Sequence, residues 1–394
     1  MAAVLQPAGQ QNLSSPKASI LWRLAAWALW LVPLLVISIT TVVKPQDHTV
    51  TPVYHEAVEN WQHHLPLYNN KYYYAPQFAL LFAPFHCLPR AAGDILWRCV
   101  ATAGIAAAML LFCGAMSGDT RDRAFFFVTL LAMPLCLQAM QFGQANAHLA
   151  AALLLAAWCL STQRWWAATI LLWLATAIKP LGIAAIGLAW AAYPQLWWRL
   201  ALGLPAFFLL PFAFGPSGYA WSQLLACGQN LRQSAGVTEH RFADLNGLLR
   251  TFGTAITGPA SLALRAVAGG LFMLLCRQAS RRHGEPLRAV VWFGAAGVFL
   301  MLFNPMTEAN SYAIVAPLFA LLAWWNFSRG ARTLGWILAG MVLSMGLLPE
   351  PLRPWFGNYF SLAWYPALTL GFLALLAWMA LGPAKSVADA QGQP

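Results

Sequence analysis

Residues 18–43 read ASILWRLAAWALWLVPLLVISITTVV, and this apolar run decides the class of fold. It is too long for the apolar core of a signal peptide and no small-residue cleavage site follows it, so we expect a retained transmembrane helix. Of the 394 residues, 60% are hydrophobic and 9% are charged, whereas soluble domains carry about 25% charged residues. So little charge leaves an apolar exterior, which only lipid tolerates. We therefore predict an all-α, polytopic integral membrane protein.

Further apolar segments follow along the chain. They lie near 75–89, 95–116, 124–140, 147–161, 167–193, 200–214, 261–276, 289–303, 313–325, 336–348 and 365–381. Several are shorter than the roughly 20 residues of a membrane span, so flanking Trp and Tyr must extend them or some are re-entrant. We predict about 12 spans in one membrane domain, residues 18–382, with a cytoplasmic tail at 1–17 and a C-terminal tail at 383–394.

Basic residues are scattered between these segments, although the formal net charge is +11. Because Lys and Arg mark the cytoplasmic ends of spans, one cytoplasmic face is expected at Arg164, Arg199, Arg277, Arg281, Arg282, Arg288, Arg329, Arg332 and Lys385. The segment 167–193 then forms a hairpin, broken at Lys179-Pro180. Segment 75–89 either crosses the membrane or dips into it and returns. Only the second choice places every later loop on the side of the membrane that the basic residues predict.

The sequence has no basic arm of the kind that would suggest a nucleic-acid partner. The seven cysteines have neither CxxC nor zinc spacing, which predicts free thiols.

The first external loop concentrates ionisable groups. Asp47 to His64 contains three of the 12 acids and four of the eight histidines. Thr51-Pro52 is typical of a helix start. An apolar stripe with helical spacing follows, which predicts an amphipathic helix on the membrane surface or on neighbouring helices, at Tyr54, Ala57, Val58 and Trp61. The other faces of this helix carry His55, Glu56, Glu59, Gln62 and His63. A merely solvated loop would have a similar composition.

Four stretches carry a family resemblance. The first is LYNNKYYYAPQFALLFAPFHCLP at 67–89, and the others follow as QFGQAN at 141–146, ATAIKP at 175–180 and NPMTEANSY at 304–312. In this order and spacing the chain resembles glycosyltransferase family 87, which contains polyprenyl-phosphate-mannose-dependent alpha-1,2-mannosyltransferases and related arabinofuranosyltransferases. The resemblance implies a GT-C-like helical bundle and transfer of a hexose, mannose in particular, or of a pentose.

The resemblance also implies a catalytic acid in the first external loop. This acid would act as a general base on the acceptor hydroxyl that attacks the anomeric carbon of the donor sugar. Alignment on Tyr54 and Ala57 puts Val50 where the family usually has Asp, and Asp47 comes three residues earlier. We therefore assign the base to Asp47, with Glu56 as the substitute.

Substrate binding is expected from polar and aromatic residues of the same stretches. The leaving phosphate needs a cation, and Lys179 is the first candidate because a lysine inside an apolar segment is costly unless it faces a cavity or a partner. A buried pair of Lys179 with Glu308 is the competing interpretation. Arg241 could also contact phosphate, and neutral amides could bind sugar hydroxyls or bond between helices. The full expected set is His48, His55, Tyr54, Tyr74, Gln77, Gln144, Asn146, Lys179, Arg241, Glu308, Asn310 and Tyr312.

The expected partners are a polyprenyl-phosphate sugar donor, a glycan or glycolipid acceptor and membrane lipid. We expect no cofactor, because the sugar is already activated by its phosphate. A divalent cation is compatible with the reaction, but nothing in the sequence supports one. The location implied is the inner (plasma) membrane, with the active face periplasmic or extracellular. Two other functions fit a lipid-linked sugar: a transporter or flippase, and a polysaccharide ligase or polymerase. The acid-bearing and histidine-bearing loop directly after the first helix favours the transferase.

Overall fold

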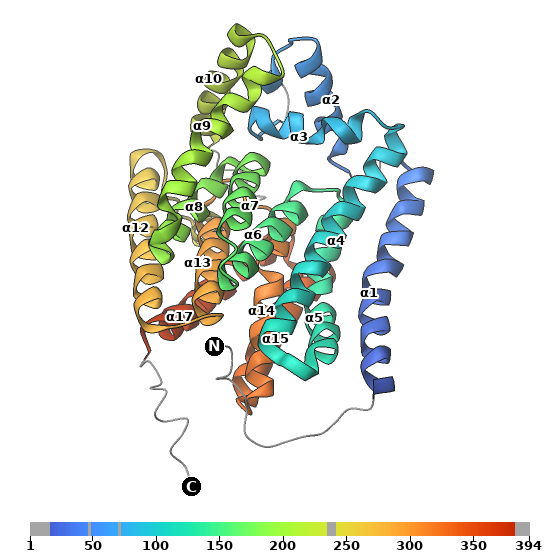
Figure 1. Ribbon diagram of the computed structural model, residues 1–394, viewed down its shortest axis with the longest axis vertical. Helices are drawn as coiled ribbons and strands as arrows, with labels where there is room; N and C mark the ends of the chain where they lie inside the picture. The colour runs from blue at the N-terminus through green and yellow to red at the C-terminus, as the bar shows by residue number, and fades with distance from the viewer. Residues whose placement is uncertain (1–15, 46–48, 70–71, 235–241, 383–394) are drawn as a thin grey trace.

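A computed structural model describes residues 16–45, 49–69, 72–234 and 242–382, and every regular element within these ranges is helical (Figure 1). Five helical stretches are long and apolar enough to cross a membrane, or six if a bent pair forms one span. The five are Ser19–Val43, Arg90–Gln141, Pro194–Ala213, Gly258–Arg282 and Tyr359–Leu381; the bent pair is Arg332–Leu347 with Pro349–Phe356. The all-α, polytopic architecture is confirmed, while the total of about 12 spans stays a prediction.

The helices have the following bounds in the described ranges. The α-helices are α1 (Pro16–Val43), α2 (Thr51–Gln62), α3 (Pro76–His86), α4 (Arg90–Ser117), α5 (Arg121–Gln141), α6 (Ala145–Ser161), α7 (Trp165–Ile178), α8 (Ile183–Ala192), α9 (Trp197–Ala213), α10 (Ser217–Ser234), α11 (Leu245–Thr251), α12 (Gly258–Arg282), α13 (Leu287–Phe303), α14 (Ala316–Ser328), α15 (Arg332–Leu347), α16 (Pro349–Phe356) and α17 (Tyr359–Leu381). The short 3-10 turns are η1 (Leu67–Asn69), η2 (Gly118–Thr120), η3 (Pro180–Gly182), η4 (Pro194–Leu196) and η5 (Ala309–Ile314).

The stretch Arg90–Gln141 crosses the bundle twice. Its 52 residues would reach about 78 Å as one straight helix, against a hydrocarbon thickness of about 30 Å. Instead the chain turns back at Gly118, whose φ is +51°, and α4 and α5 pack against each other.

Helix α3 is too short to cross a membrane, because its 11 residues reach only about 16 Å. Segment 75–89 is therefore not a full crossing, which excludes the first of the two predicted choices. The N–H of Val50 donates to the carbonyl of Phe142 (3.0 Å), which joins the start of α2 to the end of α5.

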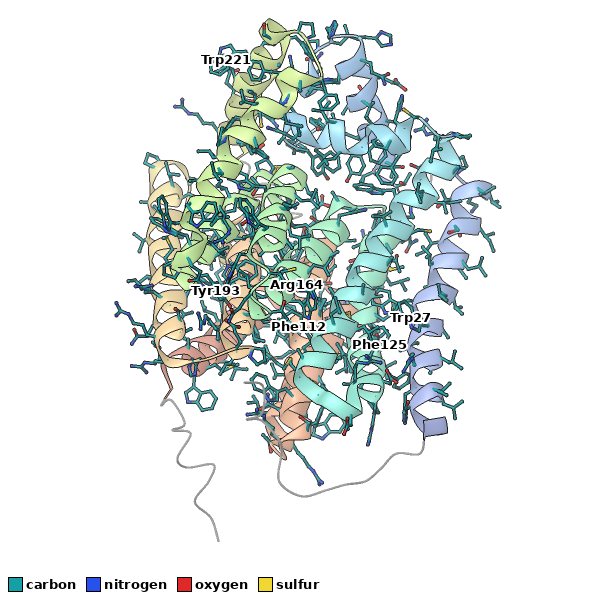
Figure 2. The ribbon with its side chains drawn as sticks, viewed as in Figure 1. Trp27, Phe112, Phe125, Arg164, Tyr193 and Trp221 are labelled. Atoms are coloured by element: carbon teal, nitrogen blue, oxygen red, sulfur yellow. The ribbon has the colours of Figure 1, made fainter. Side chains whose placement is uncertain are left out.

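Buried and lipid-facing helices are clearly separated. Most residues of α6 and α13 are buried, as expected for helices that are apolar all round. The outer helices α1, α9 and α12 expose large apolar side chains instead, among them Leu21 (67%), Leu209 (62%) and Leu262 (68%). Trp221 also projects outward, from α10 at one end of the molecule (Figure 2). Such a wide apolar exterior requires lipid around it.

The helices α2, α3 and α10 gather at one end of the bundle, and we call this group the end cap (Figure 1). The predicted helix of the first loop is α2, and its stripe is buried against neighbouring helices: Tyr54, Ala57, Val58 and Trp61 are at most 5% exposed. The ring of Tyr54 meets those of Phe78 and Phe82 edge-on. His55 differs from the expectation, because it is also buried and turns toward α4 rather than solvent.

The predicted break at Lys179-Pro180 is confirmed. Helix α7 ends at Ile178, Lys179 has extended backbone angles (φ −142°, ψ 117°), and Pro180 starts the turn η3 before α8. Proline cannot donate the N–H that a continuous helix needs and disfavours helical angles at the residue before it. The two halves, α7 and α8, remain in contact. The break thus leaves a lysine on irregular backbone inside an apolar region.

Candidate active site

Five polar residues chosen from the sequence meet in one hydrogen-bond network, which we call the amide network. The Nζ of Lys179 donates to Oδ1 of Asn146 (2.9 Å). The Nδ2 of Asn146 lies 2.9 Å from Oε1 of Gln144 and 3.0 Å from Oδ1 of Asn310. Both Gln144 and Asn310 donate their amide N–H to Oε2 of Glu308, at 3.1 and 3.2 Å. Motifs separated by more than 160 residues therefore form one cluster.

Each member of the amide network comes from a place where a helix starts or breaks. Gln144 precedes α6 with extended angles (φ −71°, ψ 139°), and Glu308 precedes η5 in the same way. Lys179 lies at the α7–α8 break. Irregular backbone at membrane depth is tolerated where it is buried in protein or lines a cavity. The three motifs therefore share one structural property: they interrupt helices at a common site.

The two charged members of the network are linked through neutral groups. Asn146 stands next to Lys179, and Gln144 and Asn310 stand next to Glu308. Lys179 and Glu308 themselves form no direct ion pair within 4.0 Å, and both are partly exposed. The competing interpretation of a direct buried pair therefore does not describe the geometry. A substrate that reaches Glu308 therefore need not first separate it from Lys179.

A cavity of about 390 Å³ opens beside Glu308 and Asn310, and we call it the polar cavity. Its other polar walls include Gln138 and Gln141 of α5 and Arg353 of α16. Ligand cavities in proteins commonly measure about 300–1,000 Å³ and orient their ligand with a few polar groups. This one has the carboxylates of Glu308 and Glu350, amides, and the Arg353 guanidinium, which pairs with Glu350 (3.8 Å). These are groups that bind sugar hydroxyls and phosphate.

A pair of tyrosines connects the end cap to the amide network. The hydroxyls of Tyr54 and Tyr74 are 2.8 Å apart, and the N–H of Ala145, next to Gln144, donates to the Tyr54 hydroxyl (3.2 Å). Burial raises the pKa of Tyr54 well above its usual value and that of Tyr74 to about 12. Both phenols are therefore neutral at physiological pH and can donate hydrogen bonds. Through them the position of α2 is tied to the start of α6.

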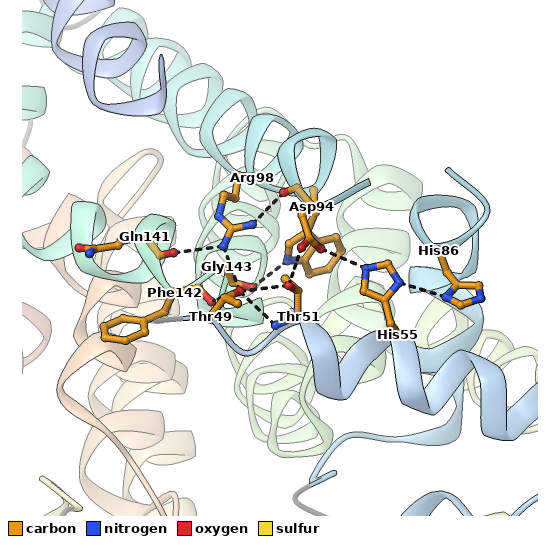
Figure 3. A network of polar contacts seen from close by, with 10 residues as sticks. Thr49, Thr51, His55, His86, Asp94, Arg98, Gln141, Phe142 and Gly143 are labelled. Carbon is orange, nitrogen blue, oxygen red and sulfur yellow. Dashed lines mark hydrogen bonds and ion pairs between the residues drawn. The ribbon is translucent and has the colours of Figure 1, made fainter. Parts of the chain in front are cut away.

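A second polar cluster, the Asp94 network, attaches α2 to α4 (Figure 3). Oδ2 of Asp94 accepts from the Thr51 hydroxyl (2.9 Å), and Oδ1 lies 3.1 Å from Nε2 of His55. The Nδ1 of His55 is 3.0 Å from Nδ1 of His86 at the end of α3. Only one of these two rings can supply the hydrogen between them. A carboxylate that is 1% exposed thus begins a chain of contacts that ends at a partly exposed histidine.

Arg98, one turn along α4 from Asp94, holds the end of α5 (Figure 3). Its guanidinium donates to the carbonyls of Met140 (3.1 Å) and Gln141 (3.2 Å) and to the Thr49 hydroxyl (3.0 Å). These carbonyls belong to the last turn of α5, where a cation is favoured. Gly143 follows with φ +62°, and a Cβ there would lie 2.9 Å from Thr51 Cγ2 and 3.0 Å from Arg98 Cζ.

The other residues chosen from the sequence lie outside these two networks. Gln77 is buried and donates to the carbonyl of Phe207, and Tyr312 donates to that of Ala243 and packs on Tyr365. Glu56 is on a partly exposed face of α2. Asp47, His48 and Arg241 lie outside the described residues. The acid assigned as the base therefore stays a prediction.

Sequence reasoning missed Asp94 and His86 and did not assign Arg98 a role. One signal was available for Asp94 and Arg98: ionisable side chains that begin an otherwise apolar helix are costly in lipid and usually have a specific partner. His86 gave no such signal, because its partner His55 lies 31 residues away and the contact depends on how α3 folds back on α2.

Comparisons with known proteins identify relatives of this chain. The model of the family described as Glycosyltransferase family 87 matches residues 72–305. A similar protein from Mycobacterium tuberculosis (strain CDC 1551 / Oshkosh) is 26% identical over 334 residues, 78% of this chain and 72% of the relative. One from Mycolicibacterium smegmatis (strain ATCC 700084 / mc(2)155) is 26% identical over 331 residues, 78% and 76% of the two chains. Both are named polyprenol-phosphate-mannose-dependent alpha-(1-2)-phosphatidylinositol pentamannoside mannosyltransferase.

Proposed function

Because this chain belongs to glycosyltransferase family 87, we propose that it transfers mannose from polyprenyl-phosphate-mannose to a hydroxyl of a lipid-linked glycan. The relatives' names supply the donor and the class of acceptor. The observation that carries the proposal is the amide network: family motifs distant in sequence converge on one lysine, one carboxylate and three amides beside a cavity.

The reaction exchanges one bond at the anomeric carbon. The acceptor oxygen forms its bond there, the bond to the phosphate oxygen breaks, and polyprenyl phosphate leaves with the electron pair. The proton of the acceptor hydroxyl passes to a carboxylate, which we assign to Asp47 with Glu56 as the alternative. We expect this step to require no cofactor, because the phosphate is already a good leaving group.

The remaining groups position and stabilise the reactants. Lys179 would stabilise the negative charge that grows on the phosphate as the bond breaks. Gln144, Asn146 and Asn310 can donate to or accept from sugar hydroxyls, since each amide carries both kinds of group. Glu308 lines the polar cavity and would accept from a hydroxyl of the acceptor sugar. Holding both substrates in line supplies much of the rate enhancement.

We place the active face outside the cytoplasm on the charge pattern of the first spans. Arg121 and Arg123 follow the α4–α5 turn, and Arg23 near the start of α1 pairs with Asp122 there (2.7 Å). Clustered arginines favour the cytoplasm for this end of the bundle. The end cap, at the other ends of α1 and α4, would then face the periplasm or extracellular space, where a lipid-linked donor displays its sugar.

The test uses the purified full-length protein with synthetic polyprenyl-phosphate-mannose and a lipid-linked mannoside acceptor. We expect transfer by the parent, unchanged by EDTA, and a loss of about 100-fold or more for Asp47→Asn or Glu56→Gln, whichever removes the base. Neither acid is the base if both variants turn over at the parental rate. An inactive parent, tested also with polyprenyl-phosphate glucose and arabinofuranose, would reject the proposed class of reaction.

A further inference from the structure

A second cavity, also of about 390 Å³, lies between α1 and the facing sides of α4 and α5, and we call it the α1 cavity. One part of its wall is apolar and includes Val32, Val36 and Ile37 of α1. Val32 and Val36 are 59% and 57% exposed on an outer helix, so this part opens toward the surrounding lipid. A lipid chain can therefore enter from the side without crossing the bundle.

The wall changes from apolar to cationic along α1. From Val32 to Lys44 the helix rises by about 18 Å at 1.5 Å per residue, and the wall passes through Thr40 and Thr41 before it reaches Lys44. At that polar end Arg98 and Thr49 complete the wall. An apolar groove that ends in two cations matches a molecule with a long hydrocarbon chain and an anionic head, which is the chemistry of a polyprenyl phosphate.

Arg98 is suited to hold the anionic head. It is 3% exposed, and its bonds to Met140, Asp94, Thr49 and Gln141 all end on neutral oxygens. These bonds account for four of the five guanidinium N–H groups. Within the part of the chain that the structure describes, no carboxylate forms an ion pair with it. The Asp94 carboxylate acts on Arg98 through its charge but forms no direct ion pair with it, so an anionic ligand would give the guanidinium a charged hydrogen-bond partner.

The α1 cavity adjoins the polar cavity. Leu137 and Gln141, near the end of α5, line both. A phosphate held at Arg98 would therefore lie one side chain away from the cavity that contains Glu308 and Asn310. This arrangement keeps the two lipid substrates apart and brings their reacting ends together at Gln141.

We propose that the α1 cavity binds the polyprenyl phosphate of the donor, with Arg98 and Lys44 at the phosphate and α1 along the chain, while the polar cavity receives the acceptor. The inference rests on the proposed donor class and goes beyond it, since it assigns the donor to one groove and adds Arg98 to Lys179 as a ligand of the donor phosphate.

The first test narrows the groove without touching any polar group. Val36→Trp fills the apolar part of the α1 cavity, and Leu35→Trp is the matched control, because Leu35 is 62% exposed on the same helix and does not line the cavity. In the full-length protein we expect Val36→Trp to raise the KM for polyprenyl-phosphate-mannose at least 10-fold. The acceptor KM should change less than about 2-fold, and Leu35→Trp should match the parent. A rise in the acceptor KM alone, or no change in either KM, would overturn the assignment.

The second test measures binding alone. Native mass spectrometry of the same proteins with sugar-free polyprenyl phosphate should show binding to the parent and Leu35→Trp and at least 10-fold weaker binding to Val36→Trp and Arg98→Gln. Polyprenol without phosphate should bind no better to the parent than to Arg98→Gln. Equal retention of phosphatidylglycerol and polyprenyl phosphate by the parent would make the groove an ordinary lipid site and reject the proposal.

The two tests separate failure of the inference from failure of the proposed function. Selective polyprenyl phosphate binding without mannose transfer would leave the groove assignment standing and reject the function. Mannose transfer that is insensitive to Val36→Trp would support the proposed function and reject the groove assignment. Because Arg98 also bonds the end of α5, Arg98→Gln can fail to fold, and Val36→Trp then decides the matter alone.

Discussion

The amide network and the Asp94 network contain the same kinds of group but arrange them differently. In the amide network, neutral amides separate Lys179 from Glu308, and the carboxylate reaches a cavity. In the Asp94 network the carboxylate bonds its partners directly, is 1% exposed and lines neither cavity. An acid that is already satisfied and enclosed can hold helices together, whereas one that faces a cavity can meet a substrate. Position relative to the cavity, more than residue type, distinguishes the roles.

The largest effect is expected from Lys179→Met, which removes the only cation of the amide network while keeping much of its volume. We expect kcat/KM to fall by about 100-fold or more, because the leaving phosphate loses its charge stabilisation. Steady-state transfer measures this, and Lys179→Arg should retain part of the activity. A Lys179→Met protein with parental activity would reduce the amide network to a structural cluster.

A smaller effect is expected from Glu308→Gln. The amide oxygen can still accept from Gln144 and Asn310, so the variant removes the charge and leaves the fold in place. We expect kcat/KM to fall about 10-fold, with a melting temperature close to that of the parent. Glu350→Gln is the matched control, because it also lines the polar cavity but lies outside the amide network. Equal losses in both variants would show that Glu308 has no special part.

We expect Asp94→Asn to lower the stability of the folded protein more than it lowers the rate of sugar transfer. The neutral amide can no longer pair with His55 as a carboxylate does, and a buried polar group left poorly paired costs about 1–3 kcal/mol. We expect a lower melting temperature in detergent, a several-fold loss of kcat and unchanged KM values for both substrates. Thr51→Val, which removes the other bond to Asp94, should reproduce part of the loss. A large rise in donor KM instead would move Asp94 into the substrate site.

The smallest effect is a pH dependence from His86. Burial and the neighbouring His55 lower the pKa of His86, so the unfolded chain takes up this proton at higher pH than the folded protein does. The stabilisation is present above the unfolded pKa of about 6.5 and is lost as pH falls through the lower folded value. Melting temperatures between pH 7.5 and 5 should fall less in His86→Asn than in the parent. His63→Asn, at an exposed position, serves as the control and should behave like the parent.

Sequence patterns were sufficient for local structure and for one of the two networks. The stripe from Tyr54 to Trp61 predicted a helix and its buried face, and Lys179-Pro180 predicted the break, because helical period and proline geometry are local properties. The amide network was accessible through motif order. The Asp94 network was not, since Asp94 meets His55 only after α3 folds back and packs against both α2 and α4. Such contacts depend on tertiary packing, which a single sequence does not reveal.

Gly143 has a consequence for how this chain can vary over evolutionary time. Its backbone angles favour glycine, and the space for one more methyl group is already taken by Thr51 and Arg98. A single added carbon would act as a wedge at the point where α2, α4 and α6 converge, although it removes no chemical group from either network. We therefore expect Gly143 to resist substitution during evolution. A substitution there should be tolerated only together with a smaller residue at Thr51 or Arg98.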